Sequence, residues 1–553
     1  MTLRLRSIIT VSLTVLAALI VFVALVVPEG IGRLKPGYWV PGAFLRLPIE
    51  AIVGAAVLLI VPQRLRKPAA LLIGGGIGVL AILKIINIGF LTVLARRFDP
   101  VLDWPLLGDG YNFVTETSGT PAAVAAVAGA IIGSIGLVVL LAWAVLRLSA
   151  IAARHRRVAT RAVPAVAAAW VALALVGVTL FPYAPVASDT TAVLARTTLA
   201  NIPRSLQDQR SFAAEAADDP YATVPPAQLL RALRGKDVVI GVVESYGRSA
   251  LENPKMAAIL DPALDAANSR LTADGFQSRS GYLTSSTYGG GSWLAHATFQ
   301  SGMWVNQQQR YRQLTSGAGN RLTLTKAFHK AGWNTVAVEP GNKHAWPEKD
   351  FYGYEEVYDS RNLGYKGPQF GWSSMPDQFT LASFQRTVYS RPNRGPLMAE
   401  VTLTSSHTPW APQPKMVDWD QVGDGSIFGP MVNNMTEDEV WKSTGKVRSA
   451  YATSVGYSIT ALTEWATRYG SDDLVMIMFG DHQAAPRVSG VDASHDVPIS
   501  IVAKDPAVLD RIAGWGWQDG IRPDEEAPVM KMDAFRDKFL TAYAAPLGTK
   551  SPH

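Results

Sequence analysis

The 553-residue sequence contains no cysteine, so no disulfide supports any exported part of the chain. Charged residues are also scarce: they make up 17% of the sequence, against 48% for hydrophobic residues. This balance is too apolar for an ordinary soluble protein. The sequence shows neither an internal repeat nor a low-complexity tract. These absences exclude a disulfide-rich secreted domain and a repeat array, and they leave a marked apolar excess to be explained.

The apolar residues crowd into the first third of the chain, in runs long enough to cross a lipid bilayer. The first run could be a signal peptide, but four more follow it, which favours a retained helix. The sequence therefore predicts a transmembrane domain of five helices over residues 1–183. The predicted spans are Ile8–Val27, Ala43–Val61, Ala69–Ala95, Ala122–Leu148 and Val163–Phe181.

Basic residues flank these spans unevenly, and loops rich in lysine and arginine stay in the cytoplasm. The basic segments are Arg4 with Arg6, Arg64 to Lys67, and Arg154 to Arg161. This pattern predicts a cytoplasmic N-terminus, and five crossings then place everything after Pro182 outside a bacterial cell membrane. The net charge of +6 largely reflects these loops, so it indicates membrane topology and not nucleic-acid binding.

The sequence changes character after the last span. Residues 184–235 are predicted to form a connector with polar helical stretches. From residue 236, short apolar runs such as DVVIGVVE and DLVMIMFGDH alternate with longer amphipathic segments. This alternation predicts an extracellular α/β domain over residues 236–553 with a largely parallel central sheet. A segment of about 320 residues is long enough to bury a core without disulfides.

Polar residues follow the carboxyl ends of several predicted strands. Glu244 ends VVIGVVE, His407 ends VTLTSSH, and Asp481 with His482 ends VMIMFGDH. Because ligands bind at the carboxyl edge of open α/β sheets, these side chains are expected to converge. Two carboxylates and an imidazole suit Zn²⁺ or Mn²⁺. The alternative is that Glu244 caps a helix and that Asp481 and His482 form a hydrogen-bonded turn.

A candidate nucleophile lies in the segment STYGGGSWLAHATFQSG. Three glycines precede Ser292, and a helix-like stretch follows it. A glycine turn before a helix leaves backbone N–H groups free to hold an anion. A serine at such a helix start can ligate a metal ion and attack phosphorus. The alternative is a serine helix cap after a flexible loop.

The motifs VVES, GGGSW, SSH and FGDH occur in this order behind the apolar spans. Together they resemble the alkaline-phosphatase/sulfatase superfamily, and they look most like membrane-bound phosphoglycerol transferases of the lipoteichoic-acid-synthase type. The resemblance covers nearly the whole chain and implies a sulfatase-like catalytic domain. It implies that one divalent ion, Mn²⁺ or Zn²⁺, is held by Glu244, Ser292, Asp481 and His482. Ser292 takes the nucleophile position, where the family usually has threonine, and His407 would contact the phosphate or protonate the leaving group.

Three further residues are implied in substrate binding by the same resemblance. Trp346 resembles the substrate-contacting tryptophan of the family, but the nearby arginine of the family is not at the same spacing. Lys349 could replace it as a point charge without its bidentate contact. His495 resembles a substrate-site histidine of the phosphoethanolamine transferases, or it lies in a capped loop before the next strand.

The resemblance implies transfer of a phospho-headgroup, with glycerol phosphate as the expected group. The donor would be a phospholipid such as phosphatidylglycerol, and the acceptor an envelope glycolipid or polymer. Alternatives are a phosphoethanolamine transferase, a phosphodiesterase, a non-catalytic scaffold or a transporter. True sulfatase activity is not expected, because the residues after Ser292 lack the proline and arginine that direct formylglycine formation. Lys84, inside a predicted span, could reach a lipid phosphate, or it could snorkel or pair.

Overall fold

The computed structural model describes residues 3–32, 41–181, 184–316, 321–372 and 374–544. The chain divides into two compact units, Met1–Asp208 and Gln209–His553. The division falls inside helix α7 (Thr190–Ala217), a long helix in the segment expected to connect the two parts. Residue 183, where the predicted membrane domain ends, lies outside the described residues. Each unit is described by itself.

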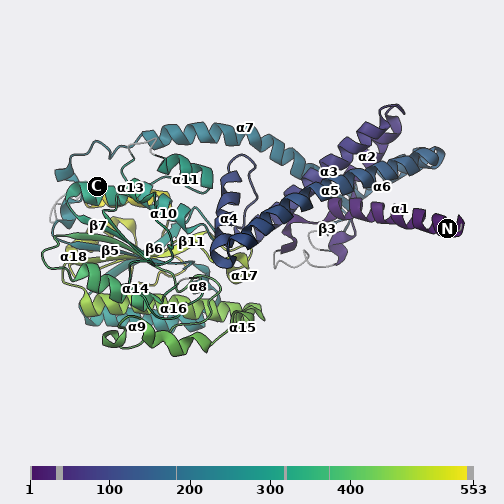
Figure 1. Cartoon of the computed structure of the whole chain (residues 1–553). Helices are drawn as coiled ribbons and strands as arrows, with labels where there is room; N and C mark the ends of the chain where they lie inside the picture. The colour runs from purple at the N-terminus through teal and green to yellow at the C-terminus, as the bar shows by residue number, and fades with distance from the viewer. Residues whose placement is uncertain (1–2, 33–40, 182–183, 317–320, 373, 545–553) are drawn as a thin grey trace. The chain divides into compact units, whose positions relative to one another are not determined.

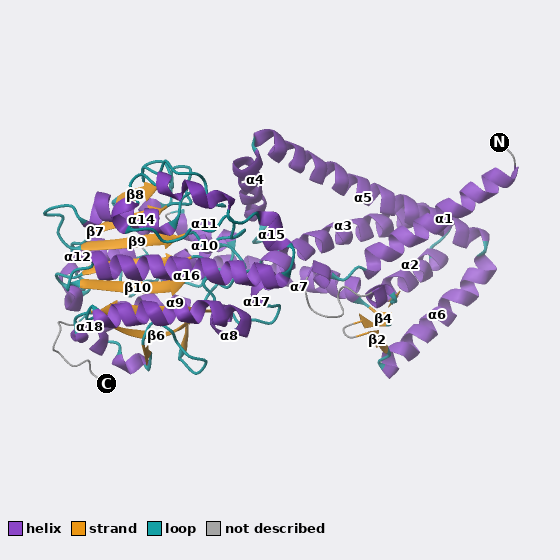
Figure 2. Cartoon of the chain, turned by 90° about the horizontal axis from the view of Figure 1, so that it is seen from below, coloured by secondary structure: helices purple, strands orange, loops and turns teal. Residues whose placement is uncertain are grey.

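The N-terminal unit is built mainly from helices (Figure 2). Within its described residues, four helices are long and apolar enough to cross a membrane. These are α1 (Leu3–Val26), α3 (Arg66–Val93), α5 (Thr120–Arg154) and α6 (Arg156–Val176). The unit also contains α4 (Trp104–Ser118) and the short strand pairs β1 (Leu47–Pro48) with β4 (Ala187–Ser188) and β2 (Thr179–Phe181) with β3 (Ala184–Pro185).

The second predicted span is much shorter in the structure than in the sequence-based expectation. Helix α2 covers only Ile49–Ile60, 12 residues. Such a helix is about 18 Å long, whereas the hydrocarbon core of a bilayer is about 30 Å thick. Proline accounts for the shortening, because Pro48 directly precedes the helix and Pro62 follows its last residues. The five full-length spans expected from the sequence are therefore not confirmed.

Helices α3 and α5 approach closely through Gly74 and Gly78. A Cβ at Gly74 would lie 2.6 Å from the Ala142 Cα, and one at Gly78 would lie 2.8 Å from the Val138 Cα. Small residues spaced by four along a helix allow such backbone contact in membranes. Lys84, farther along α3, is buried and donates to the carbonyl oxygens of Ala24 and Leu25 at 3.0 and 2.7 Å. Its ammonium is thus paired with the end of α1.

The C-terminal unit is organised around a sheet of nine strands (Figure 1). Eight of them lie in the order β12-β6-β11-β10-β5-β9-β7-β8, and β13 pairs with β6. Their bounds are β5 Asp237–Val243, β6 Gln277–Thr284, β7 Asn334–Glu339, β8 Glu356–Asp359, β9 Leu397–Leu403, β10 Leu474–Gly480, β11 Asp496–Ala503, β12 Gln518–Asp519 and β13 Val529–Lys531.

The sheet is mixed, which corrects the expectation of a largely parallel one. Strands β10, β5, β9, β7 and β8 run parallel, but β11 is antiparallel to both β10 and β6. The reason lies in the connection between β10 and β11, which contains only the four-residue helix α17 (Pro486–Ser489). A parallel return usually needs a full helix that crosses a face of the sheet, and this connection has no such helix.

Helices cover both faces of this sheet (Figure 1). On one face Val239 and Val243 of β5 pack in a core with α9 (Pro254–Ala273), α14 (Asp377–Phe384) and α16 (Thr444–Tyr469). On the other face Val238 and Val242 pack with α10 (Ser292–Ser301), α12 (Leu324–Ala331) and α19 (Phe535–Ala542). Shorter helices are α8 (Ser249–Glu252), α11 (Gln308–Thr315), α13 (Lys349–Tyr352), α15 (Glu437–Trp441) and α18 (Pro506–Asp510).

The strand register brings the polar strand ends together. Val243, the last residue of β5, is paired with Gly480 of β10 on one side and with Leu403 of β9 on the other. Glu244 and Asp481 are therefore neighbours directly beyond two adjacent parallel strands. The segment that leads to His407 begins beside them, at the end of β9.

Candidate metal centre and active site

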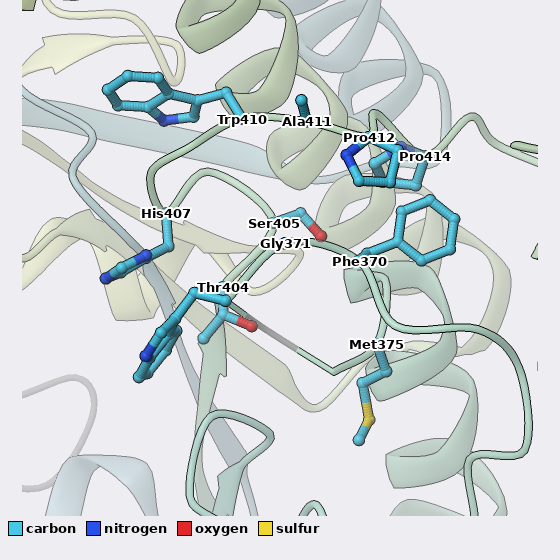
Figure 3. Close-up of a pocket in the computed structure, with 11 residues that line it drawn as sticks. Phe370, Gly371, Met375, Thr404, Ser405, His407, Trp410, Ala411, Pro412 and Pro414 are labelled. Atoms are coloured by element: carbon cyan, nitrogen blue, oxygen red, sulfur yellow. The ribbon is translucent and has the colours of Figure 1, made fainter. Parts of the chain in front are cut away.

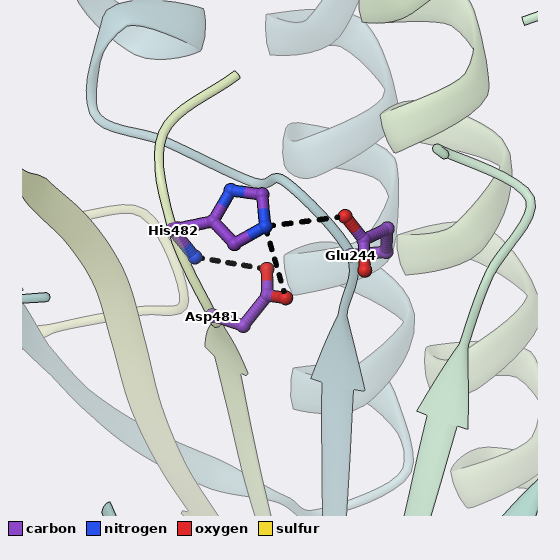
Figure 4. Close-up of side chains that lie close together, drawn as sticks. All are labelled: Glu244, Asp481 and His482. Carbon is purple, nitrogen blue, oxygen red and sulfur yellow. Dashed lines mark hydrogen bonds and ion pairs between the residues drawn. The ribbon is translucent and has the colours of Figure 1, made fainter. Parts of the chain in front are cut away.

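Glu244, Asp481 and His482 form a compact buried group at this edge of the sheet (Figure 4). One potential ligand atom from each residue lies within 4.8 Å of the others. The His482 Nε2 atom is 3.5 Å from Glu244 Oε1 and 3.5 Å from Asp481 Oδ2. The three side chains point toward one another from two strand ends, as expected from the sequence.

Local backbone contacts fix this convergence. A Cβ at Gly480 would lie 1.9 Å from the Tyr246 carbonyl oxygen, so only glycine lets β10 end this close to the turn after β5. In that turn Ser245 has a φ of 57° in the left-handed region. Its backbone N–H donates to Asp481 Oδ1 at 2.7 Å, and the His482 N–H donates to the same oxygen at 2.8 Å. One oxygen of Asp481 is thus held by two backbone donors.

The remaining atoms of the group fit a divalent cation. Asp481 Oδ2 is buried and has no hydrogen-bond partner among the described residues. The His482 Nδ1–H donates to the Gln483 carbonyl oxygen at 2.8 Å, because a carbonyl can only accept. In the neutral ring the Nε2 lone pair is then directed into the group, which is the tautomer that a metal-ligating histidine adopts. A cation between these atoms would satisfy a carboxylate oxygen that the protein leaves unpaired.

The electrostatics of the group also favour a cation. Burial raises the pKa of Asp481, and the neighbouring Glu244 raises it further. Burial acts on Glu244 in the same direction, but the charges of His482 and His407 and hydrogen bonds from Ser245 and Ser292 lower the pKa of Glu244 to about 2. Two carboxylates in one buried site thus oppose each other's ionisation. A divalent cation would allow both to be ionised.

Ser292 lies at the first position of α10 and completes the group. Its Oγ is 3.0 Å from Glu244 Oε2 and 3.2 Å from His482 Nε2. Ser292 is half-buried, whereas the residues of α10 from Leu294 to Ser301 are buried. The hydroxyl therefore lies within reach of the predicted ligand atoms, with a helix N-terminus beside it. The structure brings Glu244, Ser292, Asp481 and His482 together.

His407 stands near this group on the segment after β9. Its charge is among the influences that lower the pKa of Glu244. The His407 Nδ1–H donates to the Thr408 carbonyl oxygen at 2.6 Å, so Nε2 is the nitrogen left for proton transfer. The ring stacks on Trp372, with centroids 4.3 Å apart. His407 also lines a small cavity with Thr404, Ser405 and Trp410 (Figure 3).

Asp377, at the start of α14, positions the segment that carries His407. Its Oδ1 accepts from the Ser405 N–H, its own N–H donates to Ser405 Oγ, and its Oδ2 accepts from Ser458 Oγ at 2.6 Å. Ser406, which follows Ser405 in the chain, donates its hydroxyl to the Glu244 carbonyl oxygen at 2.6 Å. The segment is thereby tied both to α14 and to the residue that supplies a predicted ligand.

The three other expected substrate residues have different surroundings. The Trp346 ring packs against Tyr352 and Tyr354, with centroid distances of 5.0 and 5.8 Å. Lys349 Nζ pairs with Asp350 at 2.8 Å on an exposed part of α13. His495 is exposed, and its ring lies 5.1 Å from Tyr288 in the segment that leads to Ser292. In the described part of the chain, none of the three forms a hydrogen bond or ion pair with the metal-ligand candidates.

The sequence analysis did not find a second buried group of the same composition. One potential ligand atom from each of His296, Glu339 and Glu400 lies within 4.8 Å of the others. A signal was present for two of them, because His296 follows Ser292 by one helical turn and Glu339 ends a predicted strand at the same sheet edge. Glu400 lies inside β9, where no sequence pattern marked it.

Comparison with known proteins gives a family for the C-terminal unit. Residues 237–497 match the Sulfatase family, and the resemblance to the alkaline-phosphatase/sulfatase superfamily is confirmed. The match includes Glu244, Ser292, His407, Asp481 and His482. No curated protein sequence matches the chain.

Solved structures with a similar fold include three bacterial proteins. The lipoteichoic acid synthase LtaP from Listeria monocytogenes is 14% identical, with a TM-score of 0.37, over 62% of this chain and 78% of that one. The Streptococcus pyogenes phosphoglycerol transferase GacH, in complex with sn-glycerol-1-phosphate, is 12% identical, with a TM-score of 0.37, over 61% and 82%. The soluble domain of lipooligosaccharide phosphoethanolamine transferase A from Neisseria meningitidis is 15% identical, with a TM-score of 0.36, over 58% and 93%.

Proposed function

We propose that this protein is a metal-dependent phosphotransferase that moves a phospho-headgroup from a membrane phospholipid to an acceptor in the cell envelope. The observation that carries the proposal is the position of the Ser292 hydroxyl, 3.0 Å from Glu244 and 3.2 Å from His482 at the start of α10. A hydroxyl beside a cation site and a helix N-terminus is suited to attack a phosphodiester. The match of residues 237–497 to the Sulfatase family supports this class of chemistry.

The first step would form a covalent serine phosphodiester. A divalent cation at Glu244, Asp481 and His482 would lower the pKa of an adjacent hydroxyl and offset the charge of a phosphate oxygen. Ser292 gives its proton to solvent, and its Oγ forms a bond to phosphorus while the bond to the diacylglycerol oxygen breaks. The leaving oxygen takes a proton from His407 Nε2, whose ring is oriented by Thr408 and Trp372.

The second step would release the headgroup phosphate from Ser292. The acceptor hydroxyl gives its proton to His407 and bonds to phosphorus while the Ser292 Oγ–phosphorus bond breaks, and Ser292 Oγ takes back a proton from solvent. Water in place of the acceptor would make the protein a phosphodiesterase. The motif order that resembles the lipoteichoic-acid-synthase type favours glycerol phosphate as the group and phosphatidylglycerol as its donor, with Mn²⁺ or Zn²⁺ as the ion.

The N-terminal helices would keep the catalytic domain near its lipid substrate and so raise the effective concentration of the donor. We further propose that the N-terminus is cytoplasmic and the catalytic domain extracellular. This orientation needs an odd number of membrane crossings, so α2 and its flanking residues would form a fifth crossing. Because the natural chain has no cysteine, single cysteines at Gln63 and Ser494 can test this directly. An impermeant maleimide should label Ser494→Cys and not Gln63→Cys in intact cells, and the reverse pattern would refute the orientation.

The phosphotransferase proposal is tested by turnover of fluorescent phosphatidylglycerol with the purified full-length chain. Mn²⁺ or Zn²⁺ should support release of labelled diacylglycerol, and a chelator should abolish it. Ser292→Ala should lower the rate by at least about 10³-fold, as expected for loss of a nucleophile. The matched control is Ser316→Ala, an exposed serine at the end of α11, which should retain full activity. Near wild-type turnover in Ser292→Ala would refute the nucleophile.

The same assay separates the alternatives within this fold. Phosphatidylethanolamine in place of phosphatidylglycerol identifies a phosphoethanolamine transferase. Analysis of the water-soluble products distinguishes free headgroup phosphate, the product of a phosphodiesterase, from headgroup phosphate joined to an added glycan or glycolipid. Absence of turnover with both lipids would favour a non-catalytic role for the domain.

A further inference from the structure

His296 lies one helical turn after Ser292 on α10 and is buried. In a helix, side chains four residues apart share a face, and the Cα–Cβ bond leans toward the N-terminus of the helix. The His296 ring therefore extends along the same face as Ser292, toward the end of α10 where the hydroxyl stands. Its charge interacts with the charges of Asp481 and His482, two of the metal-ligand candidates.

One ring nitrogen of His296 is occupied by an ion pair. Nδ1 is 3.1 Å from Glu400 Oε1, and the other Glu400 oxygen accepts from the Tyr354 hydroxyl at 2.8 Å and from Gln300 Nε2. Gln300 is itself fixed, because its carbonyl oxygen accepts from the N–H and the hydroxyl of Thr325 at 3.0 Å. Glu400 is thus an ionised, fully hydrogen-bonded partner whose position leaves the imidazole little freedom to turn.

The other ring nitrogen has no such partner. His296 Nε2 is buried and without a hydrogen-bond partner among the described residues. A buried imidazolium N–H that remains unpaired is costly, so native structures normally pair such a group with protein, water or a ligand. Asp481 Oδ2 is unpaired in the same region, and there the missing partner fits a cation. When His296 is protonated, its Nε2–H is an unpaired donor, and the missing partner is then an acceptor.

We propose that His296 is a phosphate-binding residue, whose Nε2–H donates to a non-bridging oxygen of the phosphate that Ser292 attacks. The inference rests on the proposed function. It adds to that function a protein side chain on α10, the His296 imidazolium, that binds the phosphate. Lys349, the expected cation, has its ammonium on Asp350 at 2.8 Å. The His296–Glu400 pair supplies a positive donor that is already oriented and needs no side-chain ordering on binding.

The charges around His296 support a protonated ring at neutral pH. Burial alone would lower the pKa of His296, but the hydrogen bond and charge of Glu400 on β9, together with the charges of Glu339 at the end of β7 and Asp481 after β10, raise it to about 9. His482, also after β10, opposes this with a like charge. Burial and the charge of Glu400 raise the pKa of Glu339, the third member of the group, to about 7. At pH 7 the group therefore keeps an ionised Glu400 beside a protonated His296.

The test is binding of inorganic phosphate to the metal-loaded full-length chain by titration calorimetry. His296→Gln should weaken phosphate binding by about 10–100-fold, the range for a hydrogen bond between charged groups, with unchanged metal content. The matched control is His329→Gln, because His329 also faces a glutamate, Glu355 Oε1 at 3.6 Å, but on the exposed surface of α12. This control should bind phosphate as the wild type does.

A second variant keeps the histidine and removes its partner. In the wild type, phosphate affinity should fall as the pH rises through the pKa of His296, which the hydrogen bond and charge of Glu400 hold above the ordinary value against the effect of burial. Glu400→Gln should move that fall to lower pH by more than one unit, which a purely structural role of Glu400 would not do. If His296→Gln does not fold, this pH shift alone decides the matter.

Failure of this inference is distinguishable from failure of the proposed function. Equal phosphate affinity in wild type and His296→Gln, or an unmoved pH dependence in Glu400→Gln, would overturn the role of His296 even if lipid turnover is found. Weaker phosphate binding in His296→Gln would support it even if Ser292→Ala leaves turnover intact, because phosphate binding is measured without any reaction at Ser292.

Discussion

The molecule contains two buried groups that each consist of one histidine and two carboxylates, and they are built in opposite ways. In the group of Glu244, Asp481 and His482, one carboxylate oxygen has no partner and the Nε2 lone pair is directed inward. In the group of His296, Glu339 and Glu400, donors are supplied to both carboxylates. The Thr402 hydroxyl donates to Glu339 at 2.8 Å. The Tyr354 hydroxyl donates to Glu400, and the His296 ring forms an ion pair with it.

The charges alone do not separate the two groups. In the first group burial and the charge of Glu244 raise the pKa of Asp481, and the charges of both carboxylates raise the pKa of His482 against the effect of burial. In the second group a protonated His296 faces an ionised Glu400, while the pKa of Glu339 rises to about 7. Each group thus has one carboxylate with a lowered pKa, one histidine with a raised pKa and one carboxyl with a raised pKa, and the unpaired Asp481 oxygen is what marks the first group as a cation site. Hydrogen-bond satisfaction, not residue composition, distinguishes a metal site from an ion pair of the same residues.

The largest expected effect is on metal binding. Asp481→Asn removes a charge and the unpaired oxygen from the first group, and it should weaken binding of Mn²⁺ or Zn²⁺ by more than about 100-fold, since even loss of a residue that only supports a ligand costs 10–100-fold. Glu400→Gln likewise replaces one buried carboxylate by an amide, but in the second group, and it should leave the metal stoichiometry at one ion per chain. Calorimetry and elemental analysis of the purified chain measure both.

Two results would contradict this contrast. If Glu400→Gln lowered the metal content as much as Asp481→Asn, the second group would also be a cation site. If Asp481→Asn bound metal as tightly as the wild type, the unpaired oxygen of Asp481 would have another explanation. A melting curve for each variant in the presence of chelator shows whether the fold itself is intact.

A smaller effect is expected on the pH dependence of stability. His296 has a pKa of about 9 in the folded chain, above the ordinary value of 6.5, so its contribution to stability is fully present below pH 6.5 and is lost as the pH rises through 9. With metal in excess to hold the first group ionised, the melting temperature of wild type should exceed that of His296→Gln most at pH 6.5. The difference should shrink by ~2–5 °C by pH 9. A constant difference across this range would mean that His296 is not charged in the folded state.

Much of the fold follows from the sequence because buried strands are recognisable as apolar runs. Strands β5, β7, β9, β10 and β11 coincide with apolar runs of the sequence, which include WNTVAVEP for β7 and VPISIVAK for β11. An apolar run does not encode strand direction, and so the antiparallel β11 could not be distinguished from a parallel strand. Strand β6, read as QSRSGYLT, was missed because its polar residues hide a strand that is buried only after the sheet has assembled.

In the candidate site, too, some residues are marked by a sequence pattern and others are brought together only by the fold. Glu244, Asp481 and His482 could be found because strand ends at one sheet edge must converge, whatever the loops do. Ser292 could be found because three glycines precede it and a helix-like stretch follows it. Glu400 could not be found, because its side chain becomes significant only through contacts with His296 and Tyr354 from distant segments. Trp372, which stacks on His407, was also missed, since only the fold brings these residues side by side.

The smallest expected effect concerns Lys349, whose assignment as a substrate residue came from resemblance. Its ammonium is 2.8 Å from Asp350 Oδ1, and both side chains are exposed. Surface ion pairs of this kind contribute ~0–1 kcal/mol, so Lys349→Ala should change KM for the lipid donor by less than about threefold and leave kcat unaltered. His296→Gln, in the same lipid assay, should have a much larger effect. A tenfold or greater rise in KM for Lys349→Ala would show that the lysine leaves Asp350 to bind substrate. The main cationic side chain of the protein at the phosphate would then be Lys349 on α13 and not His296 on α10.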